Sequence, residues 1–181
     1  MELASFILDI AGGSIGSGAN WIRVSIVEDL RSDQLTLQMI DNGRGMSRRE
    51  IRRALSRPES SYHRLAELAE LCSGWLHLDS KPGRGTALTV TFKHSHIDRP
   101  PLGDMARALM TLLSMIGGGT LVYTHKVILR RGEEEFKLNT SELREQLDGV
   151  PIDHPGVKRW LAKRIDEEEK RLERLVREEG R

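Results

Sequence analysis

The chain has 181 residues, of which 38% are hydrophobic and 30% charged, and this composition is typical of a globular protein. Lys and Arg number 28 against 27 Asp and Glu, so the formal net charge of +1 gives no long-range attraction to nucleic acid or to a membrane surface. The single cysteine, Cys72, excludes a disulfide framework and an all-cysteine metal site within one chain.

The first half of the chain predicts helices that alternate with two hairpins. Apolar residues at helical spacing predict a helix over residues 2–15, although three glycines near its end weaken it. Alternation in WIRVSIVED and in QLTLQMID, joined by RSD, predicts an antiparallel hairpin. Ser47 is placed to cap a helix over RREIRRALS, and a second amphipathic helix is expected over residues 62–72. GWLHLDS and TALTVTFKH predict another hairpin around the turn KPGRG.

This order of elements predicts an α+β fold, a two-layer sandwich in which helices cover one face of a mainly antiparallel sheet. The later sequence predicts a C-terminal helix–hairpin–helix extension, with Thr140 or Ser141 as the cap of one short helix. The charged final helix fits either docking by one apolar stripe or a role in binding a partner or in self-association; the stripe consists of Leu161, Ile165, Leu172 and Val176. We therefore divide the chain into a domain of residues 1–96 and an extension of residues 97–181.

Two short motifs carry the chemistry of the chain. In MIDNGRGMS, a predicted strand ends in Asp41, and Gly43 and Gly45 follow it. Glycine lets the backbone approach a ligand closely, and a strand-end carboxylate suits an amine donor such as the amino group of adenine, although a tight loop explains the same pattern. In SKPGRGTALTV, Gly85 and Thr86 lead into a strand, where the hydroxyl group suits either a ligand or the strand start.

The order of these pieces resembles the ATP-binding domain of the GHKL superfamily, which comprises DNA gyrase, Hsp90-like chaperones, sensor histidine kinases and mismatch-repair ATPases. The resemblance covers about residues 2–93 and implies the Bergerat-type, histidine kinase-like fold. It implies that Asp41 binds the adenine amino group, that Thr86 supports adenine recognition, and that Asp9 occupies the position of the acid that activates water. The other nucleotide-contacting positions that it implies are Gly43, Gly45, Met46 and Gly85.

Two parts of the family's triphosphate machinery are missing. The asparagine that holds Mg²⁺ in the family falls at Gly13, which has no side-chain oxygen for a hard cation. The long lid, whose glycines hold phosphate at a helix N-terminus, is replaced by ALSRPESSYHRLAEL, in which Arg57 and His63 are cationic and nearby but form no backbone amide cradle. We therefore expect binding of ATP or ADP without Mg²⁺, Asp9 as a vestigial base, and little or no hydrolysis.

The C-terminal part, from HIDRPPLGDMARALMTLL onward, resembles a bacterial branch of small, free-standing members of this superfamily. Members of that branch are often encoded beside iron-hydrogenase or NADH-dehydrogenase-type subunits, which implies a protein partner in a redox or signalling complex. The leading hypothesis is an adenine-nucleotide-binding regulatory or interaction module. Two alternatives stay open: a working Mg²⁺-dependent ATPase or histidine kinase-like enzyme that uses Asp9, and a structural partner of a redox complex that binds no nucleotide.

The remaining patterns favour no further site. HSHID places His94 and His96 two residues apart without further ligands, so we expect surface imidazoles at a strand end rather than a metal site. Cys72 lies on an apolar helix face and is expected in the core. The N-terminus lacks the basic region of a signal peptide, and no apolar run approaches the roughly 20 residues of a membrane span. We therefore expect a cytoplasmic protein without nucleic-acid or membrane partners.

Overall fold

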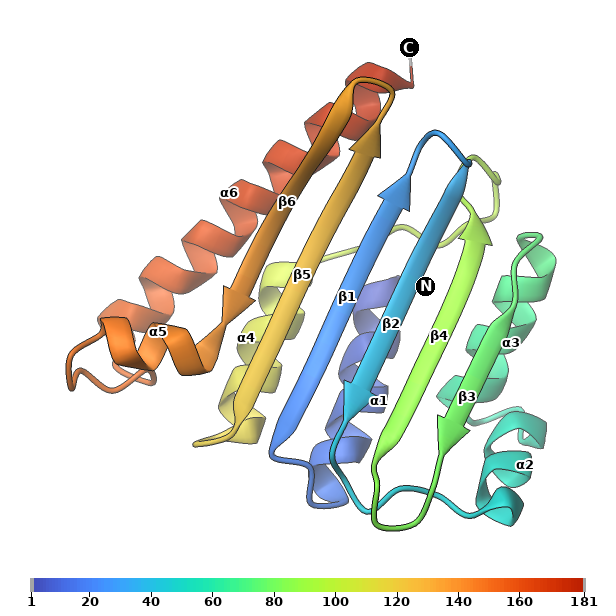
Figure 1. Ribbon diagram of the computed structural model, residues 1–181, viewed down its shortest axis with the longest axis horizontal. Helices are drawn as coiled ribbons and strands as arrows, with labels where there is room; N and C mark the ends of the chain where they lie inside the picture. The colour runs from blue at the N-terminus through green and yellow to red at the C-terminus, as the bar shows by residue number, and fades with distance from the viewer. Residues whose placement is uncertain (1, 181) are drawn as a thin grey trace.

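The structure, a computed structural model, describes residues 2–180 as one six-stranded sheet with six helices (Figure 1). The strands are β1 (Trp21–Asp29), β2 (Gln34–Asp41), β3 (Leu76–Ser80), β4 (Thr86–Lys93), β5 (Thr120–Leu129) and β6 (Gly132–Asn139). The helices are α1 (Leu3–Gly16), α2 (Arg48–Ser56), α3 (Ser61–Leu71), α4 (Met105–Ile116), α5 (Thr140–Gln146) and α6 (Pro155–Glu179).

The strand order is β3-β4-β2-β1-β5-β6. β1 and β5 run parallel, whereas all other neighbouring strands of this sheet are antiparallel. The predicted α+β two-layer sandwich with a mainly antiparallel sheet is thereby confirmed. None of the helices within residues 2–180 is both long enough and apolar enough to cross a membrane.

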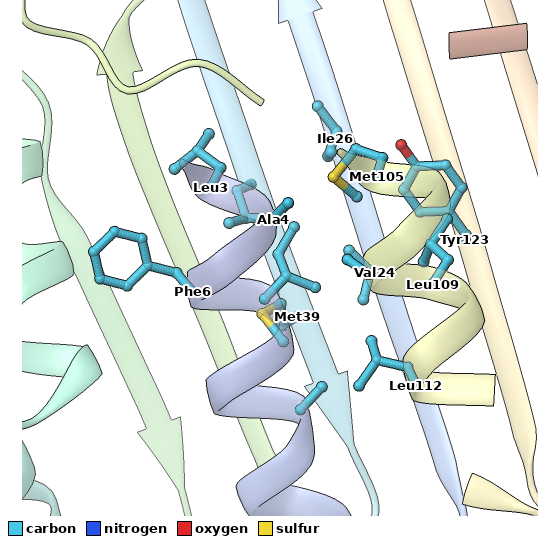
Figure 2. Packing of buried hydrophobic residues seen from close by; sticks show 14 of the residues in the cluster. Leu3, Ala4, Phe6, Val24, Ile26, Met39, Met105, Leu109, Leu112 and Tyr123 are labelled. Carbon is cyan, nitrogen blue, oxygen red and sulfur yellow. The ribbon is translucent and has the colours of Figure 1, made fainter. Parts of the chain in front are cut away.

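The sheet has one buried face and one face that the helices leave uncovered. Along β1, the side chains of Val24 and Ile26 are buried, whereas Ser25 between them is only partly covered. α1 and α4 lie side by side over the buried face, and α3 and α6 flank them (Figure 1). Figure 2 shows this packing, in which Leu3, Ala4 and Phe6 of α1 and Met105, Leu109 and Leu112 of α4 surround Val24, Ile26 and Met39.

The strands before and after the expected domain boundary belong to one continuous sheet. β5 pairs with β1 along its whole length, from the pair Trp21 and Thr120 to the pair Asp29 and Ile128. One buried cluster contains both Phe6 of α1 and residues of α4. The elements after residue 97 therefore widen the same sheet and the same helical layer.

Helix ends confirm one capping prediction and correct another. The Ser47 hydroxyl group accepts a hydrogen bond from the backbone of Glu50, and the Glu50 carboxylate accepts one from the backbone of Ser47, so α2 begins with a capping box. The prediction that Thr140 or Ser141 caps α5 is wrong. Asn139 caps this helix, because the buried hydroxyl group of Thr140 instead accepts a hydrogen bond from the backbone of β5.

The apolar stripe of α6 docks on the rest of the protein. Leu161, Ile165 and Leu172 are buried in the common core, and Val176 packs against its edge. The structure therefore shows the docked arrangement of this helix, and it leaves binding of a partner by the remaining surface untested.

Candidate functional site

Asp41 ends β2 and is in register with Thr86, which begins β4. A cavity of about 190 Å³ lies beside this pair, between α1, α3 and the loop that follows β2. Of the expected nucleotide-contacting residues, this cavity brings together Asp41, Gly43, Gly45, Met46 and Thr86. Gly85 lines a second cavity of about 190 Å³ on the other side of Asp41 and Thr86. Asp41 and Thr86 border both cavities, which therefore lie where β2 ends and β4 begins.

Two donors hold the carboxylate of Asp41. The hydroxyl group of Ser14 donates a hydrogen bond of 2.8 Å to Oδ2, and the backbone of Gly43 donates one of 2.8 Å to Oδ1. A carboxylate has about four lone-pair positions, so acceptor capacity remains for a ligand. Ser14 is a site residue that the sequence reasoning missed, and its place next to Gly13 on α1 is the only signal that indicated it.

The hydroxyl group of Ser80 forms hydrogen bonds with both motifs of the site. Its hydroxyl group donates to the carbonyl oxygen of Gly85 at 2.8 Å and accepts from the backbone of Met46 at 2.8 Å. The hydroxyl oxygens of Ser80 and Thr86 are 2.9 Å apart. Because Ser80 has only one hydroxyl proton and donates it to Gly85, Thr86 is the donor in this pair. Both lone pairs of the Thr86 hydroxyl oxygen are then left for a ligand.

Gly45 and Gly85 allow the two loops of the site to cross at close range. Both have positive φ, of 68° and 80°. A Cβ atom on Gly45 would lie 2.0 Å from the carbonyl oxygen of Lys81, and one on Gly85 would lie 1.9 Å from that of Asp41. These distances are far below van der Waals contact, so the backbone at both positions requires glycine.

Tyr62, on α3, closes the cavity opposite Asp41. Burial and the neighbouring Asp41 carboxylate raise the pKa of Tyr62 to about 12, so the phenol group stays neutral. The short connection between α2 and α3 brings Tyr62 there, because α3 begins only five residues after α2 ends at Ser56 and Ser60 caps it. Sequence reasoning identified this short connection but not the tyrosine that it places in the site.

Three arginines line a neighbouring cavity of about 540 Å³, namely Arg44, Arg53 and Arg57. This cavity shares Arg44 and Met46 with the cavity beside Asp41, so the two are adjacent. Arg44 also forms an exposed ion pair of 2.9 Å with Glu50. Glu50 and Glu59 line the same cavity, so three guanidinium groups stand against two carboxylates there. The guanidinium groups of Arg53 and Arg57 can each donate two hydrogen bonds to a phosphate group.

The structure places His63 away from this cavity. Its Nδ1 atom lies 2.7 Å from the carbonyl oxygen of Leu55, and its Nε2 atom lies 3.3 Å from the Glu67 carboxylate. His63 thus joins α2 to α3. Of the two cations expected near the phosphates, only Arg57 lines the cavity.

Asp9 and Gly13 lie one turn apart on α1, but only Gly13 lines the cavity beside Asp41. The Asp9 side chain is 58% exposed, and its carboxylate accepts a hydrogen bond of 3.3 Å from Ser61. Arg64 also lies 3.9 Å from this carboxylate. Asp9 therefore faces the start of α3 rather than the Asp41 pocket.

The substitution Gly13→Ala should raise the free energy of unfolding by about 0.5–1 kcal/mol, because glycine in a helix interior is unfavourable by that amount. No heavy atom lies within 4 Å of a Cβ placed at Gly13, so the added methyl group meets no obstacle. Urea unfolding measures the difference. The free energy of unfolding should rise less in the matched variant Gly12→Ala, because its Cβ would lie 3.1 Å from the methyl group of Met115. Equal gains would contradict this account of α1.

The HSHID segment lies beyond β4, which ends at Lys93. The expectation of surface imidazoles is wrong for His94, whose Nε2 atom lies 2.6 Å from a buried carboxylate oxygen of Glu28. Within residues 2–180, no three His, Cys, Asp or Glu side chains form a group that could hold a metal ion. Cys72 is fully buried in the core, as expected.

Comparisons with known families and curated sequences identify no relative of this chain. The sequence matches no model of a known protein family, and no curated protein sequence matches it. The interpretation of the site therefore depends on its geometry and on the resemblance of its motifs.

Proposed function

We propose that this protein is an adenine-nucleotide-binding regulatory or interaction module with little or no hydrolytic activity. The observation that carries the proposal is the donor and acceptor pattern at Asp41 and Thr86. Both side chains present hydrogen-bond acceptors to one cavity, because the only hydroxyl proton of Thr86 is used toward Ser80. The exocyclic amino group of adenine supplies two N–H donors, which match these acceptors.

The arginine-lined cavity supports the same proposal at the phosphate end. A nucleotide whose base lies at Asp41 can direct its phosphates past Arg44 toward Arg53 and Arg57, because Arg44 and Met46 border both cavities. Guanidinium groups can neutralise phosphate without a metal ion. The glycine at position 13 and the position of Asp9, which faces α3, give no support to a Mg²⁺-dependent hydrolytic step.

A specific observation favours a second candidate, a structural partner that binds no nucleotide. Ser14 already donates to the carboxylate of Asp41, and Tyr62 leaves a cavity of only about 190 Å³ beside it. Typical small-molecule pockets are larger, about 300–1,000 Å³, so the base would have to displace Tyr62. In both candidates, the resemblance of the C-terminal part supports a protein partner in a cytoplasmic redox or signalling complex.

Calorimetric titration with ATP and ADP, with and without Mg²⁺, tests the proposal. We expect saturable binding that Mg²⁺ does not alter and that releases no phosphate. Asp41→Asn should weaken the binding by about tenfold or more, because it replaces a charged acceptor by an amide that also presents donors. Asp9→Asn is the matched control and should bind like the unaltered protein.

Each contrary outcome favours a different alternative. Binding that requires Mg²⁺, with release of phosphate, would favour the working ATPase. The absence of heat at millimolar nucleotide would favour the structural partner. Equal weakening by Asp9→Asn and Asp41→Asn would contradict the assignment of Asp41 as the base-binding residue.

A further inference from the structure

A separate cavity of about 690 Å³ lies at the other end of the sheet from Asp41, between α6 and the segment that leads into α4. Its floor includes Glu28 near the end of β1, whereas Asp41 is paired with Ile22 near the start of β1. Apolar side chains line both sides, namely Leu102, Met105 and Ala106 on the side of α4 and Val176 on the side of α6. The volume is within the range of about 300–1,000 Å³ that is usual for small-molecule sites.

A chain of buried polar side chains forms the floor of this cavity. The Nε2 atom of His125 lies 3.0 Å from Glu28, and its Nδ1 atom lies 2.9 Å from Glu169. Glu28 also contacts His94 at 2.6 Å, and the hydroxyl group of Tyr123 donates to Glu169 at 2.8 Å. Since each ring nitrogen of His125 faces a carboxylate, the ring is an imidazolium that donates from both.

The two carboxylates determine the charge of this floor. Burial by itself lowers the pKa of His125, but the hydrogen bonds and charges of Glu169 and Glu28 outweigh it and raise this pKa to about 9. Burial by itself raises the pKa of Glu28, but its hydrogen bonds with His125 and His94 outweigh it and lower this pKa to about 2. At neutral pH two carboxylates thus share the imidazolium of His125, and Glu28 has the ring of His94 as a further partner.

The other cationic side chains around the cavity already have partners. Lys170 pairs with Asp166 at 2.7 Å, and Arg177 pairs with Glu173 at 2.7 Å. Arg99 donates its hydrogen bonds to backbone carbonyl groups of residues 94 and 100. Asp104, which caps α4, adds a further negative charge to the lining.

Glu169 is the carboxylate that a ligand can reach. Its side chain is 15% exposed, whereas that of Glu28 is 5% exposed. Each Glu169 oxygen already accepts one hydrogen bond, and each has a further lone pair. Buried ion networks of this kind are expensive to desolvate and contribute little net stability, so their presence beside a cavity is a sign of a binding role.

We propose that this cavity binds a small organic cation, a primary ammonium group with a short aliphatic body. The ammonium group donates hydrogen bonds to Glu169, and the aliphatic body lies against Leu102, Met105 and Val176. This site is independent of the nucleotide site and stands whether or not nucleotide binds at Asp41.

The test uses n-butylamine as the probe and follows the backbone amides of the full chain by NMR. We expect saturable shifts at residues 102–106 with a dissociation constant in the millimolar range, since a ligand of so few atoms binds weakly. Butyrate, which has the same aliphatic body and the opposite charge, should give no saturable shift. Glu169→Gln should weaken butylamine binding about tenfold or more, whereas the neighbouring Glu168→Gln should leave it unchanged.

A second variant covers the case in which Glu169→Gln disturbs the fold. Ala106 lies on α4, lines the cavity and is outside the buried polar chain, so Ala106→Trp fills the space without removing a charge. It should abolish butylamine binding. The proposal would be overturned by binding of butyrate in preference to butylamine, by unchanged binding in Ala106→Trp, or by the absence of saturable shifts up to about 20 mM butylamine.

Discussion

His125→Leu should lower the free energy of unfolding by about 3–5 kcal/mol near neutral pH, because it leaves two buried carboxylates without their shared cation. Glu28 is almost completely buried, and within residues 2–180 the side-chain partner that it retains in this variant is His94. Urea unfolding followed by circular dichroism measures the loss. The matched control is Lys126→Leu, which removes the adjacent cation of β5 and only a partly exposed pair with Glu133. Lys126→Leu should lower the free energy of unfolding by about 1 kcal/mol or less.

The same groups predict how the stability of the protein changes with pH. The folded-state pKa of His125 is raised from 6.5 to about 9, so its contribution is complete below pH 6.5 and is lost as the pH rises through 9. The folded-state pKa of Glu28 is lowered from 4.5 to about 2, so its contribution is present above pH 4.5 and is lost as the pH falls through 2. Both contributions are therefore complete between pH 4.5 and 6.5.

In His125→Leu, the loss of stability between pH 6.5 and 9 should disappear, because the group that titrates there is gone. Lys126→Leu should retain it. A parallel decline in the unaltered protein and in His125→Leu would show that other groups cause the alkaline loss. An unfolding free energy of His125→Leu within about 1 kcal/mol of the unaltered protein would contradict the role of His125 as the shared cation.

Gly85→Ala should both destabilise the protein by about 2–4 kcal/mol and abolish nucleotide binding. Its Cβ would lie 1.9 Å from the carbonyl oxygen and 2.8 Å from the carbonyl carbon of Asp41. Both are backbone atoms at the end of β2, so the clash is relieved only if the strand end moves. That movement displaces the carboxylate that we propose as the acceptor for adenine.

Gly83→Ala separates this clash from the strain of positive φ. Gly83 has a φ of 76°, close to the 80° of Gly85, but no heavy atom lies within 4 Å of its Cβ position. Gly83→Ala should lower the free energy of unfolding by only about 1–2 kcal/mol and leave nucleotide binding intact. Urea unfolding and the calorimetric titration measure both quantities for both variants. Equal losses of stability and of nucleotide binding in Gly85→Ala and Gly83→Ala would show that the close approach of Gly85 to Asp41 contributes to neither.

The fold was largely predictable because its signals are local. Apolar spacing predicts α1, and the same spacing predicts the docked stripe of α6, since each pattern depends on residues within a few turns of one another. The capping box at Ser47 is another short-range signal. The cap of α5 was misassigned because the Thr140 hydroxyl group has a partner on β5, which local sequence does not show.

The candidate sites were predictable only in part. Asp41 and Thr86 were identified from motif order, and the register of β2 with β4 brings them together. Ser14, in the last turn of α1, and Tyr62, in the first turn of α3, were missed because neither carries a motif of its own. Their place beside Asp41 depends on how α1 and α3 pack on the sheet.

The sequence by itself determined the elements, the buried face of each strand, and the residues that could meet at the end of β2. Only the tertiary structure decided the parallel pairing of β1 with β5, and with it the buried contact between Glu28 and His125, which are 97 residues apart. The physical reason is that periodicity and capping act between near neighbours, whereas a buried ion network exists only where several elements pack together. Glu169, 44 residues beyond His125 on a docked helix, completes that network through packing alone.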